Sequence, residues 1–139
     1  IEEFGLVAPP ADELAGYADR HRELSPLNTT IAVVATDAAL SKAGCRRVAV
    51  AAQDGLARTI RPCHTPRDGD TVFALATGAV EVNPDPTTPA SMSPEVPLLT
   101  EVGTAAADCL ARAVLVALLA AESVAGIPTY RGLLPGAFE

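Results

Sequence analysis

The stretch NTTIAVVATDAAL, residues 28–40, decides how this chain folds. A polar Asn28-Thr29-Thr30 step stands directly before an apolar, β-branched run, as is typical of a turn that enters a strand. Polar and apolar residues hardly alternate in this run, so the pattern predicts a strand at 29–36 with both faces covered. The Asn28-Thr29 step has a second interpretation, as a peptide bond that the protein cuts itself.

The residues that follow predict a helix and then a second strand. Ser41 is a suitable N-cap, and an apolar residue recurs every four positions over 41–60, at Val48, Ala52, Leu56 and Ile60. After the loop RPCHTPRDGD, the segment TVFALAT at 71–77 reads as another apolar strand, closed by Gly78. Strands separated by amphipathic helices predict an α/β fold.

Outside this centre we expect two further helices, at 11–24 and 98–121. They are separated from their neighbours by the Ser25-Pro26 step and by a proline-rich loop at 83–97. The last residues are irregular, and we expect them to pack on the body through Tyr130, Leu133, Leu134 and Phe138. The most apolar run, 113–121, is shorter than the roughly 20 residues that cross a bilayer, so we predict no membrane partner.

Composition narrows the class of protein. The 139 residues fit one domain or part of one, and 49% hydrophobic with 19% charged residues indicates a globular chain. A formal net charge of −7 argues against nucleic acid or an anionic membrane as partner. The three cysteines, Cys45, Cys63 and Cys109, are odd in number, so we expect a reducing, cytoplasmic location. The opening IEEFGLVAPP lacks Met and reads as the interior of a longer protein.

Asn28-Thr29 carries the first candidate chemistry. With the bond intact, Thr29 is an ordinary strand residue and Asn28 its turn, and spacing alone favours this interpretation. With the bond cut, Thr29 becomes an N-terminus whose free amine lies beside its own hydroxyl. An α-amine has a pKa near 8 and can accept the hydroxyl proton, which is the N-terminal-threonine form of covalent catalysis.

Asp68-Gly69-Asp70 is the second motif with candidate chemistry. Carboxylates at i and i+2 point the same way in extended backbone and could orient an amine and a hydroxyl, and Gly69 would allow close approach. The same residues could form a polar turn. The further oxygen ligands of a calcium loop are absent from the sequence, and two histidines without a Cys-x-x-Cys give no zinc pattern. We therefore predict no metal and no cofactor, and structural roles for the adjacent Cys63 and His64.

Three segments taken together resemble a known family. They are NTTIAVVATDAAL, AAQDGLARTIRPCHTPRDGDTVFALATG and AGIPTYRGLLPGAF, and the resemblance that they carry covers nearly the whole chain. They are similar to DmpA-type self-processing hydrolases, which include L-aminopeptidase/D-esterases, β-peptidyl aminopeptidases and a nylon-oligomer hydrolase. The likeness is greatest to an actinobacterial, mycobacterial branch.

The resemblance implies a four-layer α/β/β/α sandwich, like N-terminal-nucleophile hydrolases, of which this chain encodes only part. It implies autocleavage at Asn28-Thr29, so that 1–28 would end an α-chain and 29–139 would form the β-chain of one domain. Thr29 would be the nucleophile, and Asp68 and Asp70 the acidic pair. The oxyanion-stabilising group would lie in the upstream α-chain segment.

The implied activity is hydrolysis of a small peptide or amide by an aminopeptidase-type enzyme that works as a homo-oligomer of αβ units. Two alternatives stay open at this point. One is an acyltransferase of the ornithine acetyltransferase type, which shares the architecture and a threonine nucleophile. The other is a structural or interaction domain in which the fold persists without catalysis.

Overall fold

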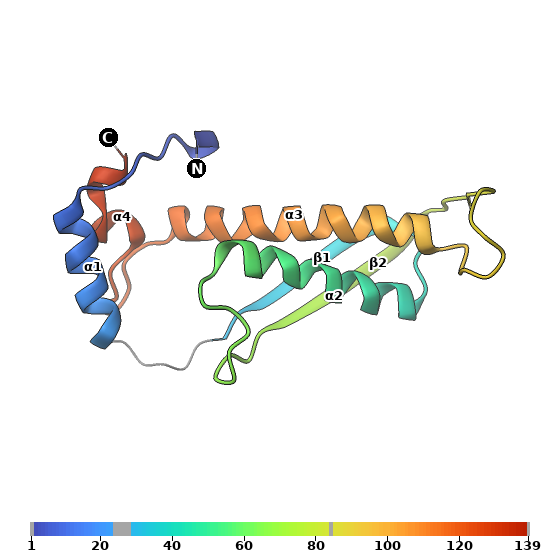
Figure 1. Ribbon diagram of the computed structural model, residues 1–139, viewed down its shortest axis with the longest axis horizontal. Coiled ribbons are helices and arrows are strands. Elements are labelled where there is room, and N and C mark those ends of the chain that lie inside the picture. Colours follow the sequence, from blue (N-terminus) through green and yellow to red (C-terminus); the bar gives the residue numbers. More distant parts are fainter. Residues whose placement is uncertain (1, 24–28, 84, 139) are drawn as a thin grey trace. The chain divides into compact units, whose positions relative to one another are not determined.

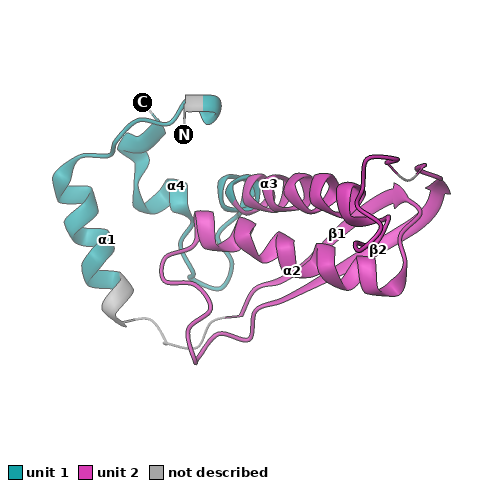
Figure 2. Cartoon of the chain, turned by 45° about the vertical axis from the view of Figure 1, so that its right-hand side comes forward, with its two compact units in different colours: residues 1–26, 115–139 teal, residues 27–114 magenta. Residues whose placement is uncertain are grey.

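A computed structural model describes residues 2–23, 29–83 and 85–138 (Figure 1). The chain divides into two compact units (Figure 2). One consists of Ile1–Pro26 and Leu115–Glu139, and the other of Leu27–Val114. The second unit carries the candidate chemistry.

The centre of the second unit is a strand–helix–strand motif: β1 (Ile31–Ala38), α2 (Lys42–Thr59) and β2 (Thr71–Val80). The two strands pair in parallel, with Ile31 opposite Thr71 and Thr36 opposite Ala76. A parallel pair needs a crossover connection, which α2 provides. The α/β class predicted from the alternating pattern is therefore confirmed.

The helix start was predicted correctly, and the strand limits were not. Ser41 caps α2, where its hydroxyl accepts a hydrogen bond from the Gly44 amide at 3.0 Å. The first strand begins at Ile31 rather than Thr29, because Thr29 and Thr30 belong to the approach to the strand. Gly78 does not close β2: it adopts a left-handed φ of 70° at an irregularity in the pairing, and the strand continues to Val80.

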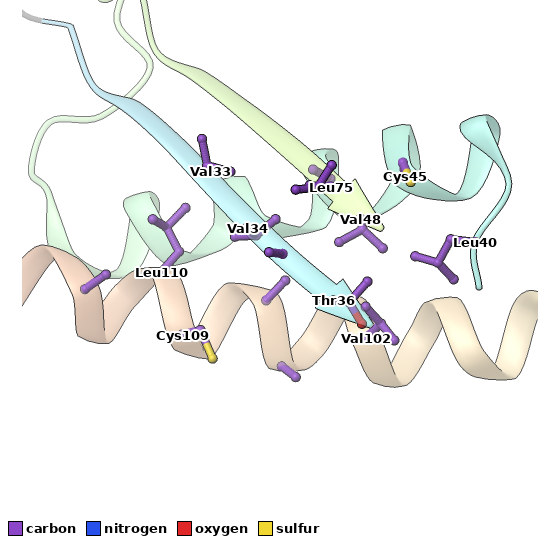
Figure 3. A pocket seen from close by; sticks show the side chains of 15 residues that line it. Val33, Val34, Thr36, Leu40, Cys45, Val48, Leu75, Val102, Cys109 and Leu110 are labelled. Carbon is purple, nitrogen blue, oxygen red and sulfur yellow. The ribbon is translucent and has the colours of Figure 1, made fainter. Parts of the chain in front are cut away.

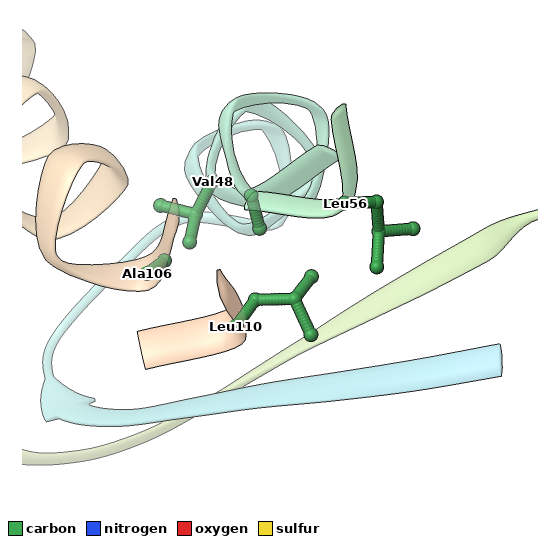
Figure 4. Close-up of a cluster of buried hydrophobic side chains, with 5 residues drawn as sticks. Val48, Leu56, Ala106 and Leu110 are labelled. Carbon is green, nitrogen blue, oxygen red and sulfur yellow. The ribbon is translucent and has the colours of Figure 1, made fainter. Parts of the chain in front are cut away.

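One face of the sheet is covered by α2 and by the first part of α3 (Val96–Ala120). Figure 4 shows the buried cluster at this contact, which consists of Val48, Ala52, Leu56, Ala106 and Leu110. The two helices approach closely at Gly55, where an added Cβ would overlap the carbonyl oxygen of Ala107. The four-residue apolar period seen in the sequence thus marks the buried stripe of α2.

The other face of the sheet is exposed in the described residues. Ile31 and Val33 of β1 are 71% and 65% exposed, and Phe73 and Leu75 of β2 are 57% and 58% exposed. The prediction that both faces are covered is therefore wrong for this chain by itself. The strands are nevertheless apolar on both faces, which is typical of strands buried between two layers.

α3 matches the helix predicted at 98–121 to within two residues at either end, but the membrane estimate considered only its most apolar run. By length and composition it could cross a membrane, since an 18-residue window has a mean hydropathy of 1.8, with 22% of that window buried. The run 113–121 on which the prediction relied covers only its last part. Core helices of soluble proteins, which are mostly buried, pass the same test of length and composition, and α3 has a buried stripe at Gly103, Ala106, Ala107 and Leu110.

In the first unit, the end of the chain packs on its beginning. α1 (Ala11–Glu23) places the Glu13 carboxylate within 3.1 Å of the Gly136 amide, and the Val7 amide bonds to the Ala137 carbonyl at 3.0 Å. The segment predicted to be irregular forms two short helices, α4 (Tyr130–Leu133) and the 3₁₀ turn η2 (Pro135–Phe138). Leu134 is buried, as expected of a packed tail.

Candidate active site

Thr29 lies at the entrance to β1, against the loop that leads into β2. A Cβ atom built on Gly69 would lie 2.9 Å from Thr29 Oγ1 and 3.5 Å from its Cγ2. The space beside the threonine hydroxyl therefore exists because residue 69 has no side chain. Thr29 as a whole residue is exposed.

Asp70 joins this loop to the residue that follows Thr29. Its Oδ1 accepts a hydrogen bond from the Thr30 amide at 2.9 Å, and the Thr30 carbonyl accepts one from the Thr71 amide at 2.9 Å. Both backbone polar groups of Thr30 are thus held by the start of β2. The Asp70 side chain is only 7% exposed, so these contacts are largely shielded from water.

The second carboxylate oxygen of Asp70, Oδ2, contacts the side chains of Cys63 and His64. His64 Nδ1 lies 2.9 Å from Asp70 Oδ2, and the Cys63 thiol donates to the same oxygen with a sulfur–oxygen distance of 3.6 Å. Adjacent side chains point apart in extended backbone, but His64 has a left-handed φ of 57°. Both side chains therefore reach one carboxylate. The structural roles predicted for Cys63 and His64 assumed that their side chains point apart, which they do not do in this loop.

These contacts fix the ionisation of the two partners. Burial alone would raise the pKa of Asp70, but hydrogen bonds from the Thr30 amide, Cys63 and His64 outweigh it and hold that pKa below its ordinary value. Burial, helped by the Asp70 carboxylate, raises the pKa of the Cys63 thiol. Asp70 is thus a carboxylate at neutral pH, and Cys63 is a protonated donor to it.

Asp68 makes different contacts from Asp70. Its Oδ2 accepts from the Thr65 amide at 2.7 Å, and its own amide donates to the Thr65 carbonyl at 3.0 Å. These bonds close the turn 65–68, which is the turn chemistry that the sequence left as an alternative. The structure therefore brings Asp70 and Gly69 to the strand that Thr29 precedes, whereas the described bonds of Asp68 lie within its own loop.

Two parts of the site could not be read from spacing. The Thr30 amide as partner of Asp70 depends on strand register, and the joint approach of Cys63 and His64 depends on one left-handed residue. Histidine is among the residues enriched in that conformation, which was the only available signal. Asn28, the other half of the predicted scissile bond, lies outside the described residues.

An apolar pocket of the second unit lies apart from these residues. Its volume is about 310 Å³, and it lies between β1, α2 and α3, lined in part by Val34, Leu40, Val48, Val102 and Leu110 (Figure 3). Cys45 and Cys109 are among the other residues that line it. Thr29, Asp68 and Asp70 do not line it, so this pocket does not contain the candidate chemistry.

The described residues thus place a threonine before the first strand of a strand–helix–strand unit, next to the residue whose amide donates to Asp70. The model of peptidase family S58 matches residues 7–131, and the chain belongs to this family. The family expected from the sequence segments is thereby confirmed.

Relatives within and beyond the mycobacteria extend this finding. The chain is 69% identical over 138 residues to an uncharacterized aminopeptidase of Mycobacterium leprae, covering 99% of this chain and 38% of that protein. It is 63% identical over 142 residues to an uncharacterized aminopeptidase of Mycobacterium tuberculosis, covering 99% and 41%. A 6-aminohexanoate-oligomer endohydrolase of Paenarthrobacter ureafaciens is 34% identical over 89 residues, 63% of this chain and 24% of that enzyme. The chain thus spans about two fifths of the length of its mycobacterial relatives.

Proposed function

We propose that this chain is the nucleophile-bearing part of a self-processing amidohydrolase of the aminopeptidase type. Thr29 is the nucleophile, and Asn28-Thr29 is the bond that the precursor cuts. Asp70 holds the new N-terminus in place, and Asp68 shapes the loop that carries Asp70. The substrate is a small peptide or amide, and the working form is a cytoplasmic oligomer of αβ units.

Processing begins when the Thr29 hydroxyl attacks the Asn28 carbonyl. The carbon–nitrogen bond breaks as the acyl group moves from nitrogen to oxygen, which leaves an ester on Oγ1 and a free amine on Thr29. Water then hydrolyses the ester and releases Asn28 as a new carboxyl terminus. The products are an α-chain that ends at Asn28 and a β-chain that begins at Thr29.

Turnover uses the amine that processing exposes. This amine accepts the Oγ1 proton while the oxygen attacks the substrate carbonyl, and it returns the proton to the leaving nitrogen. An acyl ester on Thr29 remains, and water hydrolyses it to regenerate the hydroxyl. The tetrahedral oxyanion requires donors nearby, which we assign to a part of the full-length protein outside this chain.

The observation that carries this proposal is the arrangement around Thr30. The Thr30 amide donates to Asp70 at 2.9 Å while Thr29 lies directly against Gly69. The loop thereby fixes the residue next to the nucleophile and leaves the nucleophile itself uncovered. Membership of peptidase family S58 supports the reaction class, and the relatives named for aminopeptidase and oligomer hydrolysis support an amide substrate.

Intact-mass measurement of the full-length protein tests this function. We expect two fragments separated between Asn28 and Thr29. Thr29→Ala should abolish both the cut and hydrolysis of aminoacyl amides and short oligomers of amino acids, whereas Thr29→Ser, which keeps a hydroxyl, should retain part of each. An uncut wild-type protein after long incubation, or normal hydrolysis by Thr29→Ala, would exclude the assignment.

The same assay separates the two alternatives. An acyltransferase would pass the acyl group to an added amine faster than to water, and a non-catalytic domain would bind compounds of the panel without turning them over. Neither alternative is favoured by a contact in the described residues.

We also propose that the exposed face of the sheet packs against the part of the full-length protein that this chain lacks, in a four-layer α/β/β/α sandwich. Two observations support this. The exposed face carries large apolar side chains on both strands, and more than half the length of each mycobacterial relative lies outside the match. A sheet face of this kind is normally covered in a folded domain.

A further inference from the structure

We propose that Cys63, His64 and Asp70 form a binding site for a divalent transition metal of the zinc class, directly behind the candidate nucleophile. Each of the three residues offers one ligand atom, and these atoms all lie within 4.8 Å of one another. The site combines a thiol, an imidazole and a carboxylate, which are the groups that zinc takes in proteins.

The distances between the ligand atoms fit a bound metal, although the sequence spacing of cysteine and histidine did not predict one. Zinc–ligand bonds of roughly 2.0–2.3 Å in a tetrahedral site place neighbouring ligand atoms about 3–4 Å apart. Cys63 Sγ and Asp70 Oδ2 are already separated by 3.6 Å, and His64 Nδ1 and Asp70 Oδ2 by 2.9 Å. The metal would therefore take the place of the hydrogens that now join these atoms, with small movements of the side chains.

Charge and access agree with this assignment. A thiolate and a carboxylate together neutralise a divalent cation, and the soft sulfur and imidazole favour zinc or cobalt over calcium or magnesium. The His64 side chain is 38% exposed, so water can reach the cluster and complete the fourth position. Binding releases the thiol proton of Cys63 to solvent and uses the Nδ1 lone pair of His64, and no electron is transferred.

The fold already holds the third ligand. Asp70 Oδ1 stays bonded to the Thr30 amide while Oδ2 is the oxygen that faces Cys63 and His64, so one carboxylate can serve the strand and the metal at once. A bound metal would withdraw electron density from the Asp70 carboxylate, which accepts a hydrogen bond from the residue after Thr29. Any effect of the metal on hydrolysis would rest on the proposed function, whereas binding itself does not.

Cobalt is the probe that tests binding without any activity assay. The full-length protein, freed of metal with a chelator and kept anaerobic, is titrated with Co²⁺. We expect a near-ultraviolet thiolate-to-cobalt charge-transfer band and the visible bands of tetrahedral cobalt. Added Zn²⁺ should abolish both.

Matched variants locate the metal. Cys63→Ser should remove the charge-transfer band, whereas Cys45→Ser and Cys109→Ser should keep it. His64→Ala, at an exposed side chain, should weaken cobalt binding by more than about tenfold, since even loss of an outer-shell partner has that effect. A band that is absent from the wild type, or that persists in Cys63→Ser, overturns the proposal.

Thr29→Ala separates this inference from the proposed function. This variant should bind cobalt as the wild type does, although it is expected to be inactive. If the wild type neither cuts itself nor hydrolyses amides but gives the cobalt spectrum, the metal site stands and the function falls. If hydrolysis is normal and the spectrum is missing, the reverse holds.

Discussion

Gly69 is the residue whose missing side chain makes room for Thr29. A methyl group at this position would lie 2.9 Å from Thr29 Oγ1, closer than carbon and oxygen normally approach. The threonine side chain or the loop must then move. Because the φ of Gly69 is not left-handed, the effect comes from this contact rather than from backbone strain.

Gly69→Ala is therefore expected to slow self-cleavage and hydrolysis in the full-length protein by about 10- to 100-fold, as small misplacements of reacting groups do. The measurement is the rate of fragment appearance by mass spectrometry, together with turnover of an aminoacyl amide. Gly16→Ala is the matched control, since an added Cβ there meets nothing within 4 Å. Equal rates for Gly69→Ala and the wild type would show that the contact has no role.

At the scale of single residues, the sequence predicted candidate site residues but not their contacts. Asn28-Thr29 and Asp68-Gly69-Asp70 are recognisable as motifs, and the structure places Thr29 beside Gly69. The different hydrogen-bond partners of Asp68 and Asp70 were not predictable. They depend on whether each carboxylate meets its own loop or the neighbouring strand, and side-chain direction in an irregular loop does not follow period-2 alternation.

Between elements, the contact of α2 with α3 depends on small residues. Gly55 of α2 faces Ala107, Leu110 and Ala111 of α3, and an added Cβ would be 3.0 Å from the Leu110 Cβ and 2.9 Å from the Ala111 amide nitrogen. Backbone atoms cannot rotate away as a long side chain can. The two helices would have to separate along the line of the buried cluster.

Gly55→Ala should therefore destabilise the full-length protein by about 1–3 kcal/mol, as overpacking of a core does. The gain in helix propensity, about 0.5–1 kcal/mol, opposes this and is smaller. Gly16→Ala in α1 has the same gain without the clash, so it should be neutral or stabilising. Urea denaturation of both variants measures the difference, and a stabilised Gly55→Ala would contradict the close approach.

The elements themselves were largely predictable, and their limits were less so. A capping serine and a four-residue apolar period indicated α2, because both signals are local. The ends of the strands depend instead on pairing with another segment. Gly78 looked like a stop, yet the strand passes through it because the pairing resumes at Ala38 and Val80.

For the whole molecule, the exposed sheet face is the feature that bears on how this chain packs in the full-length protein. Apolar residues on both faces of β1 predicted that both faces are covered, but only one covering layer lies in the described residues. The second layer that we propose would come from residues outside these 139, so its sequence could not be read here.

A charge on that face tests whether it is covered in the full-length protein. Val33→Asp should destabilise by more than about 2 kcal/mol if a second layer buries it, because an unpaired charge would be buried with it. Val50→Asp on α2 is the matched control: Val50 is 51% exposed against 65% for Val33. It should change stability by no more than about 0.5 kcal/mol. Equal melting temperatures for the two variants would argue that the sheet face meets water.

The two hydrogen bonds that hold the Thr30 backbone have a consequence if the chain is cut before Thr29. A new strand terminus usually frays over several residues, but here both backbone groups of the second residue are bonded to Asp70 and Thr71. Fraying would stop after a single residue, so the new amine could swing about little more than the dihedral angles of Thr29. Cutting the chain would thus create a short tether of known length, which keeps the amine and the hydroxyl within reach of the same small volume.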